Sequence, residues 1–186
     1  ELIINSRSKE VPIRVIPEGM VVFGKAISRI VSSISKVTIY GSEEVLKNIN
    51  YIRVRIDVNN LSRNREYNVA IKKPVGIRSL SSTNTKISVT LGSESTKQFD
   101  DVYIEYRNLA DGLNVQAASA ADIKISVIVK GDKTILDKLD LTTITAYVDL
   151  KGYKEGRHDI DVVVTGSDPR LSYQAKTRKI SLNIVK

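Results

Sequence analysis

The chain has 186 residues, of which 23 are Ile, 21 are Val and 11 are Thr, so that about 30% of it is β-branched. This composition favours strands over helices, and the length suits one large domain or two smaller ones. The sequence has no Cys and one His, which excludes disulfide scaffolds, thiolate zinc sites, cysteine nucleophiles and sites that need two imidazoles.

No apolar run reaches the roughly 18 residues that a membrane-spanning helix needs. The longest, from Gly19 to Gly24, has six residues. The chain also begins at Glu1, without an initiator Met or a signal peptide. We therefore expect a soluble segment of a longer protein whose targeting information lies outside this segment.

The net charge of +8 lies entirely in the first half of the chain. Residues 1–92 carry 15 basic and 7 acidic side chains, whereas residues 93–186 carry 14 of each. Any anionic partner is therefore expected to bind the first half. The candidate surface consists of Arg53, Arg55, Arg63, Arg65, Lys72 and Lys73, with Arg78 nearby in the sequence. The alternative is a basic surface that only keeps the protein soluble.

Alternation of aliphatic and polar residues predicts half-buried strands along the whole chain. In chain order the alternating segments are 11–15, 52–58, 69–71, 87–91, 102–106, 160–164 and 180–184. In the segment 52–58, for example, Ile52, Val54 and Ile56 face one side of an extended chain, and Arg53 and Arg55 face the other. Turn residues separate these strands, as at Asn59-Asn60 and Lys151-Gly152.

One short helix is expected in each half of the chain. Ser42 is the expected cap of the first helix, whose first turn holds Glu43 and Glu44, and Asp132 is the expected cap of the second. Three aliphatic residues follow each cap on one helix face, namely Val45, Leu46 and Ile49 in the first helix and Ile135, Leu136 and Leu139 in the second.

The two halves are copies of one unit. The segment VTIYGSEEVLKNI, which begins at Val37, matches VIVKGDKTILDKL, which begins at Val127, at an offset of 90 residues. KISV from Lys86 matches KISL from Lys179 at an offset of 93, a drift that loop insertions explain. The boundary falls in GSESTK, residues 92–97, which predicts two domains, 1–92 and 93–186, placed end to end on a short linker.

The order of these motifs resembles the YbbR repeat. The second unit carries VYIEYRNLADGL from Val102, then Gly131, Ile135-Leu136, and YVDLKG from Tyr147. The first unit carries Gly41, Val45-Leu46, and IDVNNL from Ile56. It departs from the pattern by having Pro17–Gly19 where the second unit has Asn108–Gly112. Together the repeats cover the chain from about Lys9 to Lys186.

The resemblance implies a mainly β fold of two tandem YbbR-like β domains, each with one short helix, in an L25-like topology. YbbR repeats in series are typical of CdaR-type regulators, in which a transmembrane helix precedes several repeats outside the cytoplasmic membrane. By this resemblance the chain is a non-catalytic, extracytoplasmic regulatory module, anchored by an N-terminal transmembrane helix outside the fragment. It is expected to control cyclic di-AMP synthesis by the membrane diadenylate cyclase. Its basic first unit is expected to contact anionic cell-wall polymers or lipid headgroups.

No catalytic, cofactor or metal site is expected. His158 precedes Asp159, which in a strand points to the opposite face and cannot orient the imidazole ring. Asp159 and Asp161 share a strand face, but two monodentate carboxylates fall short of the roughly six to eight oxygens that calcium takes. The sequence contains neither a G-x-x-x-x-G-K-[ST] loop nor a G-x-G-x-x-G loop after a strand.

The alternative function is that of an intracellular RNA-binding β-domain protein of the L25-like type. Tyr51, Arg53 and Arg55 on one strand face combine stacking with positive charge, as single-strand binding surfaces do. The same three residues also suit a cross-strand ladder of aromatic and charged side chains on an exposed sheet, and we favour that interpretation. Because the L25-like fold adds only an analogy, we expect no nucleic-acid partner.

Overall fold

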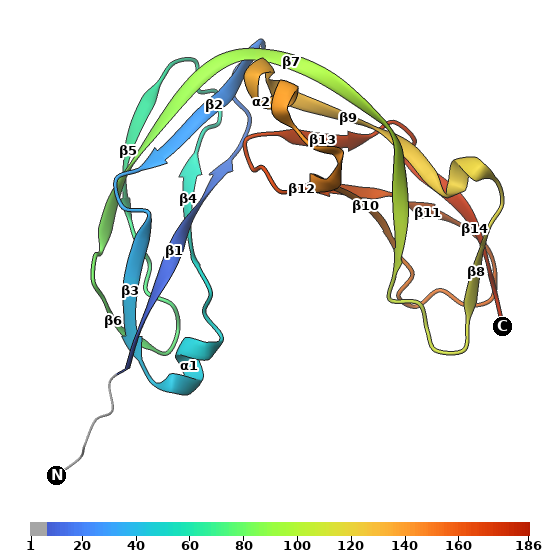
Figure 1. The fold of residues 1–186 in the computed structure, drawn as a ribbon, viewed down its shortest axis with the longest axis horizontal. Coiled ribbons are helices and arrows are strands. Elements are labelled where there is room, and N and C mark those ends of the chain that lie inside the picture. Colours follow the sequence, from blue (N-terminus) through green and yellow to red (C-terminus); the bar gives the residue numbers. More distant parts are fainter. Residues whose placement is uncertain (1–6) are drawn as a thin grey trace. The chain divides into compact units, whose positions relative to one another are not determined.

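The computed structural model describes residues 7–186, and the chain divides into two compact units. Unit 1 is Glu1–Gly92 and unit 2 is Ser93–Lys186. Each unit is built from β-strands and one short α-helix (Figure 1), and two short 3-10 turns are found in unit 2. The structure therefore confirms the mainly β fold with one α-helix per repeat.

Unit 1 packs two sheets around one core. Its elements in chain order are β1 (Arg7–Glu18), β2 (Lys25–Ser32), β3 (Lys36–Gly41), α1 (Glu43–Lys47), β4 (Ile52–Asp57), β5 (Arg65–Ala70), β6 (Ile77–Leu80) and the first part of β7 (Asn84–Arg107). One sheet has the strand order β4-β1-β3-β6, and in the other β2 and β5 both pair with β7. The pairing of β1 with β4 is parallel, with Ile13 opposite Ile52, and its neighbouring pair β1–β3 is antiparallel.

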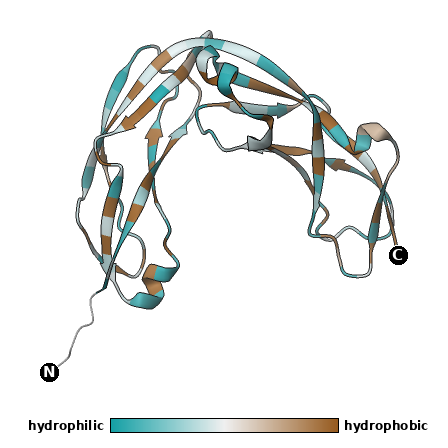
Figure 2. Ribbon diagram, in the orientation of Figure 1, coloured by the Kyte–Doolittle hydropathy of each residue, from teal (hydrophilic) through white to brown (hydrophobic). Residues whose placement is uncertain are grey.

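The core of unit 1 is made by the aliphatic positions of the alternating strands. Along β4 the buried residues Ile52, Val54 and Ile56 alternate with exposed charged residues, which confirms the period-two prediction. From the opposite sheet, Ile87 and Val89 of β7 enter the same core. Figure 2 shows this alternation as hydrophobic and hydrophilic bands along the strands. Each strand thus buries one face between the sheets and leaves the other in water.

Unit 2 repeats this topology. Its elements after β7 are β8 (Asn114–Ala117), η1 (Ala120–Asp122), β9 (Lys124–Asp132), α2 (Lys133–Lys138), η2 (Leu141–Thr143), β10 (Ile144–Asp149), β11 (Gly156–Asp161), β12 (Val163–Gly166), β13 (Ser172–Ala175) and β14 (Lys179–Val185). The order β10-β7-β9-β13 corresponds to β4-β1-β3-β6 of unit 1, and β12 adds a strand beside β10. The order β11-β14-β8 corresponds to β5, β7 and β2. The sequence repeat is therefore also a repeat of strand order.

The two helix segments dock through the predicted aliphatic residues. Leu46 and Leu136 are buried, and Val45, Ile49, Ile135 and Leu139 are partly buried against the same cores. Asp132 caps α2 as predicted, because its carboxylate accepts a hydrogen bond from the backbone N–H of Thr134 at 2.9 Å. The prediction for Ser42 is half right. Ser42 occupies the N-cap position of α1 with an extended backbone, but its side chain makes no capping hydrogen bond.

A lysine from the neighbouring strand holds the C-terminal end of each helix. Lys9 Nζ on β1 donates to the carbonyl oxygens of Leu46 and Ile49 at 3.1 and 2.8 Å. Lys97 Nζ on β7 donates to the carbonyl oxygen of Leu136 at 3.2 Å. An ammonium group at this position satisfies carbonyls that a short helix leaves open, and its charge complements the helix dipole.

The segment expected to be a linker is part of a strand. Residues 92–97 lie inside β7, and Glu94 to Lys97 pair in antiparallel register with Asp132 to Val129 of β9. The composition GSESTK is polar and contains a glycine, as linkers do, but the ladder with β9 satisfies its backbone groups. The sequence-based expectation of a short linker is therefore wrong.

The strand registers also correct the alignment of one loop. Glu18 lies opposite Asp57 in unit 1, and Arg107 lies opposite Asp149 in unit 2. Since Glu18 thus corresponds to Arg107, the loop equivalent to Asn108–Gly112 is 19–24 and not Pro17–Gly19. Pro17 and Glu18 remain within the parallel ladder, and the loop of unit 1 is one residue longer.

A glycine in unit 2 makes room for an aromatic ring. A Cβ atom built on Gly166 would lie 2.0 Å from Cζ of Tyr173. The ring is held in place, because the Tyr173 hydroxyl donates to the carbonyl oxygen of Asp168 and accepts from its N–H, both at 3.3 Å. The Asp168 carboxylate in turn accepts from Nε of Arg170 at 2.8 Å, and this bond lowers the pKa of Asp168.

Replacing Gly166 with Ala is expected to destabilise the fold by about 1–3 kcal/mol, because the new methyl group displaces the Tyr173 ring. Chemical denaturation of the whole chain measures the loss. Gly41→Ala is the control, since its Cβ atom would meet Ile77 at 3.4 Å, an ordinary contact. Equal stability of the Gly166→Ala and Gly41→Ala proteins would contradict the packing argument.

The Asp168 carboxylate is expected to make stability depend on pH. Its pKa is lowered in the folded chain from the ordinary value of 3.8, so its contribution is complete above that value and is lost as the pH falls below it. Urea denaturation at about pH 7 and about pH 3 should show a smaller loss of stability for Asp168→Asn than for the parent chain. Asp111→Asn, at an exposed turn position, is the control. If Asp168→Asn loses as much unfolding free energy between about pH 7 and about pH 3 as the parent chain, the Asp168 carboxylate is not the source of the pH dependence.

Candidate functional site

The six basic residues of the candidate surface are all exposed in unit 1. Arg53 and Arg55 lie on β4, Arg63 lies in the β4–β5 loop, and Arg65 is the first residue of β5. Lys72 and Lys73 lie in the loop between β5 and β6. The whole of β5, about 17 Å of extended chain, separates Arg65 from Lys72. The structure therefore places the six residues along the unit and does not bring them into one cluster.

Arg63 and Arg65 line a shallow pocket of about 370 Å³ that is formed by residues 59–65. Within residues 7–186, the Arg63 side chain has no hydrogen-bond or ion-pair partner. The guanidinium carbon of Arg65 lies 4.8 Å from the ring centroid of Tyr67. An anion that reaches this loop therefore meets two cationic groups with little competition from bound carboxylates.

Arg53 and Arg55 are less available for a partner. Arg55 pairs with Glu18 of the neighbouring strand at 2.9 Å, and Arg53 donates to the hydroxyl of Tyr51 at 2.8 Å. The guanidinium carbon of Arg14 on β1 lies 3.9 Å from the ring centroid of Tyr51. The ring that an RNA base would need for stacking is thus already covered on one face, as in a cross-strand ladder.

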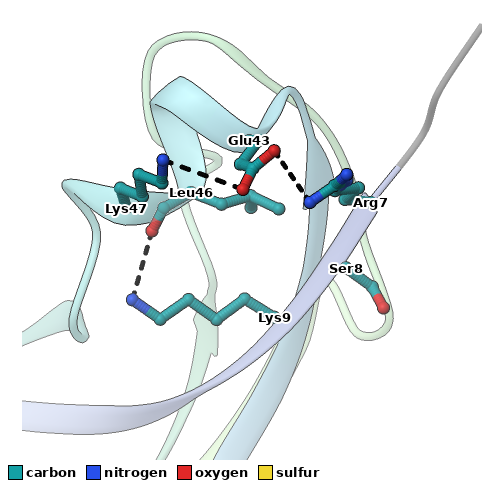
Figure 3. Close-up of a pocket in the computed structure, with 6 residues that line it drawn as sticks. All are labelled: Arg7, Ser8, Lys9, Glu43, Leu46 and Lys47. Atoms are coloured by element: carbon teal, nitrogen blue, oxygen red, sulfur yellow. Dashed lines mark hydrogen bonds and ion pairs between the residues drawn. The ribbon is translucent and has the colours of Figure 1, made fainter.

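A second pocket in unit 1, of about 270 Å³, lies between β1 and α1 (Figure 3). Its charged groups bind one another. Glu43 pairs with Arg7 at 2.7 Å and with Lys47 at 3.7 Å, and Lys9 binds the Leu46 carbonyl oxygen. Glu43, Arg7, Lys47 and Lys9 thus all have partners within α1 or β1.

Unit 2 has an open, mostly apolar pocket of about 540 Å³ at the loops that follow β7 and β10, and Tyr153 is among its lining residues. The ring of His158 packs edge-on against Tyr153, with centroids 5.1 Å apart. Nε2 of His158 donates to the carbonyl oxygen of Lys154 at 2.8 Å. The imidazole is therefore half-buried and bonded to the β10–β11 loop that precedes it.

Several exposed carboxylates of unit 2 have structural partners. Asp159 accepts a hydrogen bond from the hydroxyl of Ser181, and Asp161 lies 4.0 Å from the ammonium group of Lys179. Asp140 caps η2 through the N–H of Thr142 at 2.9 Å, which lowers the pKa of Asp140. Asp100 sits at a β-bulge in β7, and its pKa is lowered by hydrogen bonds from Ser126 and Gln98. Residues 7–186 contain no group of three or more potential metal ligands.

Two features were missed by the sequence analysis. The lysines that hold the helix ends, Lys9 and Lys97, lie 88 residues apart, close to the repeat offset, and this spacing is a signal that could have found them. The segment 19–24 was considered only as too short for a membrane span, yet Met20 and Phe23 within it are largely exposed. Over residues 7–186, no helix has the length and apolar composition required to cross a membrane.

The family of YbbR-like proteins matches the chain twice, over residues 11–91 and over residues 101–184. The "CdaA regulatory protein CdaR" of Bacillus subtilis (strain 168) is 29% identical over 181 residues, which is 96% of this chain and 38% of that protein. The chain thus spans well under half the length of this relative.

Two solved structures are also similar. The YbbR-like domain of the lmo2119 protein from Listeria monocytogenes covers 48% of this chain and 92% of its own, at 16% identity and a TM-score of 0.43. A YbbR-like protein from Streptococcus pneumoniae TIGR4 covers 99% of this chain and 96% of its own, at 13% identity and a TM-score of 0.36. Both TM-scores are low, so the assignment rests on the sequence matches. Because the family matches two consecutive stretches that cover most of the sequence, the chain belongs to the YbbR-like protein family.

Proposed function

We propose that the chain is a non-catalytic, extracytoplasmic regulatory module of a membrane-anchored protein that controls cyclic di-AMP synthesis by a diadenylate cyclase. The observation that carries this proposal is the 29% identity over 96% of the chain to a protein named as a regulator of CdaA. The two family matches support it, because the chain supplies two consecutive repeats of the kind that such a regulator contains.

The geometry is consistent with action through surfaces. The charged groups of the α1 pocket are engaged with one another, and His158 is engaged with its own loop. A module of this kind regulates a cyclase only if it binds two states of the enzyme with different affinity. In this proposal the partner of the module is the cyclase, reached through the membrane anchor of the full-length protein.

The proposal includes an anionic partner for unit 1, either a cell-wall polymer or lipid headgroups. The charge asymmetry supports it, since the whole excess of +8 lies in residues 1–92. Of the six candidate residues, Arg63 and Arg65 are placed best, because they share a pocket and are not ion-paired within residues 7–186. Arg53, Arg55, Lys72 and Lys73 contribute to the overall potential of the unit.

Deleting residues 1–186 in frame from the full-length protein is expected to change the level of cyclic di-AMP in cells that contain the cyclase. The level is measured by mass spectrometry at equal expression of the cyclase. The matched control restores the segment with Asp111→Asn, an exposed turn substitution, and should restore the original level. An unchanged level after deletion would sink the regulatory proposal.

The complete chain is expected to bind a soluble polyanion such as polyphosphate, with affinity that falls as salt is raised. The double variant Arg63→Gln, Arg65→Gln should weaken binding roughly tenfold at low salt, because two cations leave one pocket. The control is Lys151→Gln, Lys154→Gln in the corresponding loop of unit 2. Titration followed by fluorescence anisotropy measures the affinity for polyphosphate. Equal weakening by both double variants would contradict the argument from charge asymmetry.

A further inference from the structure

A turn in unit 1 displays an aromatic ring to solvent. The N–H of Lys25 donates to the carbonyl oxygen of Val22 at 3.1 Å and closes the turn, in which Gly24 has a φ of 81°. Phe23 stands at the tip of this turn and is 100% exposed, and Met20 in the same loop is 79% exposed. Two large apolar side chains exposed to water on one short loop are uncommon on the surface of a soluble protein.

The loop is held by the fold and is not a frayed segment. The carbonyl oxygen of Met20 accepts from the N–H of Asn60 at 2.8 Å, and the N–H of Val22 donates to the carbonyl oxygen of Leu61 at 3.1 Å. Val21 between them packs against the core of unit 1. The loop therefore presents Phe23 from a fixed base.

Unit 2 contains the same turn with a different tip. The N–H of Leu113 donates to the carbonyl oxygen of Ala110 at 3.2 Å, and Gly112 has a φ of 78°. The tip residue is Asp111, which is exposed. Since the repeat forms this turn with an aspartate at the tip, the fold itself does not require a phenylalanine there. The aromatic ring of unit 1 is thus a feature of its surface.

Basic residues lie on the loop of Phe23 and on the neighbouring loop that is hydrogen-bonded to it. Lys25 directly follows the turn, and Arg63 and Arg65 follow Leu61, the residue that binds Val22. Within residues 7–186 the side chains of Lys25 and Arg63 have no ion-pair partner.

The nearest carboxylates in these loops are already engaged. Glu18 pairs with Arg55 at 2.9 Å, and Asp57 accepts from the N–H of Asn59 at 2.9 Å. The loop end of unit 1 therefore combines an apolar projection with positive charge that is largely uncompensated.

We propose that the loop 19–25 inserts Phe23 and Met20 into the headgroup and acyl boundary of an anionic lipid bilayer, while Lys25, Arg63 and Arg65 bind the headgroups. An apolar projection beside basic residues suits this partner, because the bilayer takes up the Phe23 ring and the Met20 side chain and its surface potential attracts the cations. A soluble polymer would use the charges and leave Phe23 in water. The inference rests on the proposed function in one respect, in that it chooses lipid headgroups as the anionic partner of unit 1.

The predicted contact is weak and reversible. One loop buries far less apolar surface than a membrane helix, and two side chains with three cations fall short of stable anchoring. Its effect is to orient unit 1 at a surface to which the full-length protein is already tethered.

Tryptophan fluorescence tests the insertion directly, because the chain contains no tryptophan. In the complete chain, Phe23→Trp is expected to emit as a water-exposed indole in buffer. With phosphatidylglycerol vesicles its emission should shift to shorter wavelength and be quenched by brominated lipids. Asp111→Trp, at the equivalent tip of unit 2, is the matched control and should show neither change. No shift at position 23, or an emission already shifted in buffer because protein covers the ring, would overturn the proposal.

Vesicle sedimentation with the complete chain separates the two components of binding. Phe23→Ser, which removes the ring without adding a charge, should weaken partitioning into phosphatidylglycerol vesicles about tenfold without changing the urea midpoint. Arg63→Gln should weaken it about fivefold and reduce its salt dependence. Binding to phosphatidylcholine vesicles should be undetectable. Polyphosphate binding should be unchanged by Phe23→Ser, because this variant alters no charge.

The outcomes distinguish this inference from the proposed function. If Phe23→Ser leaves vesicle binding unchanged, insertion is wrong, and polyphosphate binding that depends on Arg63 still supports an anionic polymer as the partner. If deletion of residues 1–186 leaves cyclic di-AMP unchanged while Phe23→Trp inserts into vesicles, the regulatory proposal fails and the membrane contact stands.

Discussion

Burial of one side of every strand between two sheets is the constraint on which each unit depends. Ile39 and Ile87 come from opposite sheets of unit 1, and both are fully buried in one core. Val148 and Leu182 do the same in unit 2. Because alternate residues face outward, the interior can be kept while the exterior changes. The same strand order therefore supports a basic surface in unit 1 and a balanced one in unit 2.

The sequence predicts best those strands and helices that show a local periodicity. Alternation located β1, β4, β5, β7, β11 and β14, although it missed others such as β2 and β13, and the three-residue apolar faces located α1 and α2, because both signals are confined to a few neighbouring residues. It failed where pairing decides the structure. The polar segment 92–97 has the composition of a linker, and only its register with β9 makes it a strand. The loop 19–24 was misaligned because a one-residue insertion is invisible until Glu18 and Asp57 are seen to pair.

For the candidate surface, too, the sequence shows local features but not those that depend on pairing between strands. The sequence located the excess charge in unit 1 but gave equal weight to six residues, since ion pairs across strands do not follow from spacing. The structure ranks them, because Glu18 engages Arg55 while Arg63 remains unpaired within residues 7–186. Exposure of Phe23 was hidden for a similar reason. An apolar residue in a sequence is by default a core residue, and only the hydrogen bond that closes the turn shows that it stands at the tip.

The strand β7 belongs to both units, closing the second sheet of unit 1 with its first part and pairing with β9 through its second part. This arrangement sets an order for folding when the chain emerges with its N-terminus first. Unit 1 is complete in sequence once the first part of β7 has emerged, and it can fold as a domain before the rest of unit 2 follows. The remainder of β7 then emerges already attached to a folded neighbour, so that unit 2 begins with a strand whose start is fixed in place.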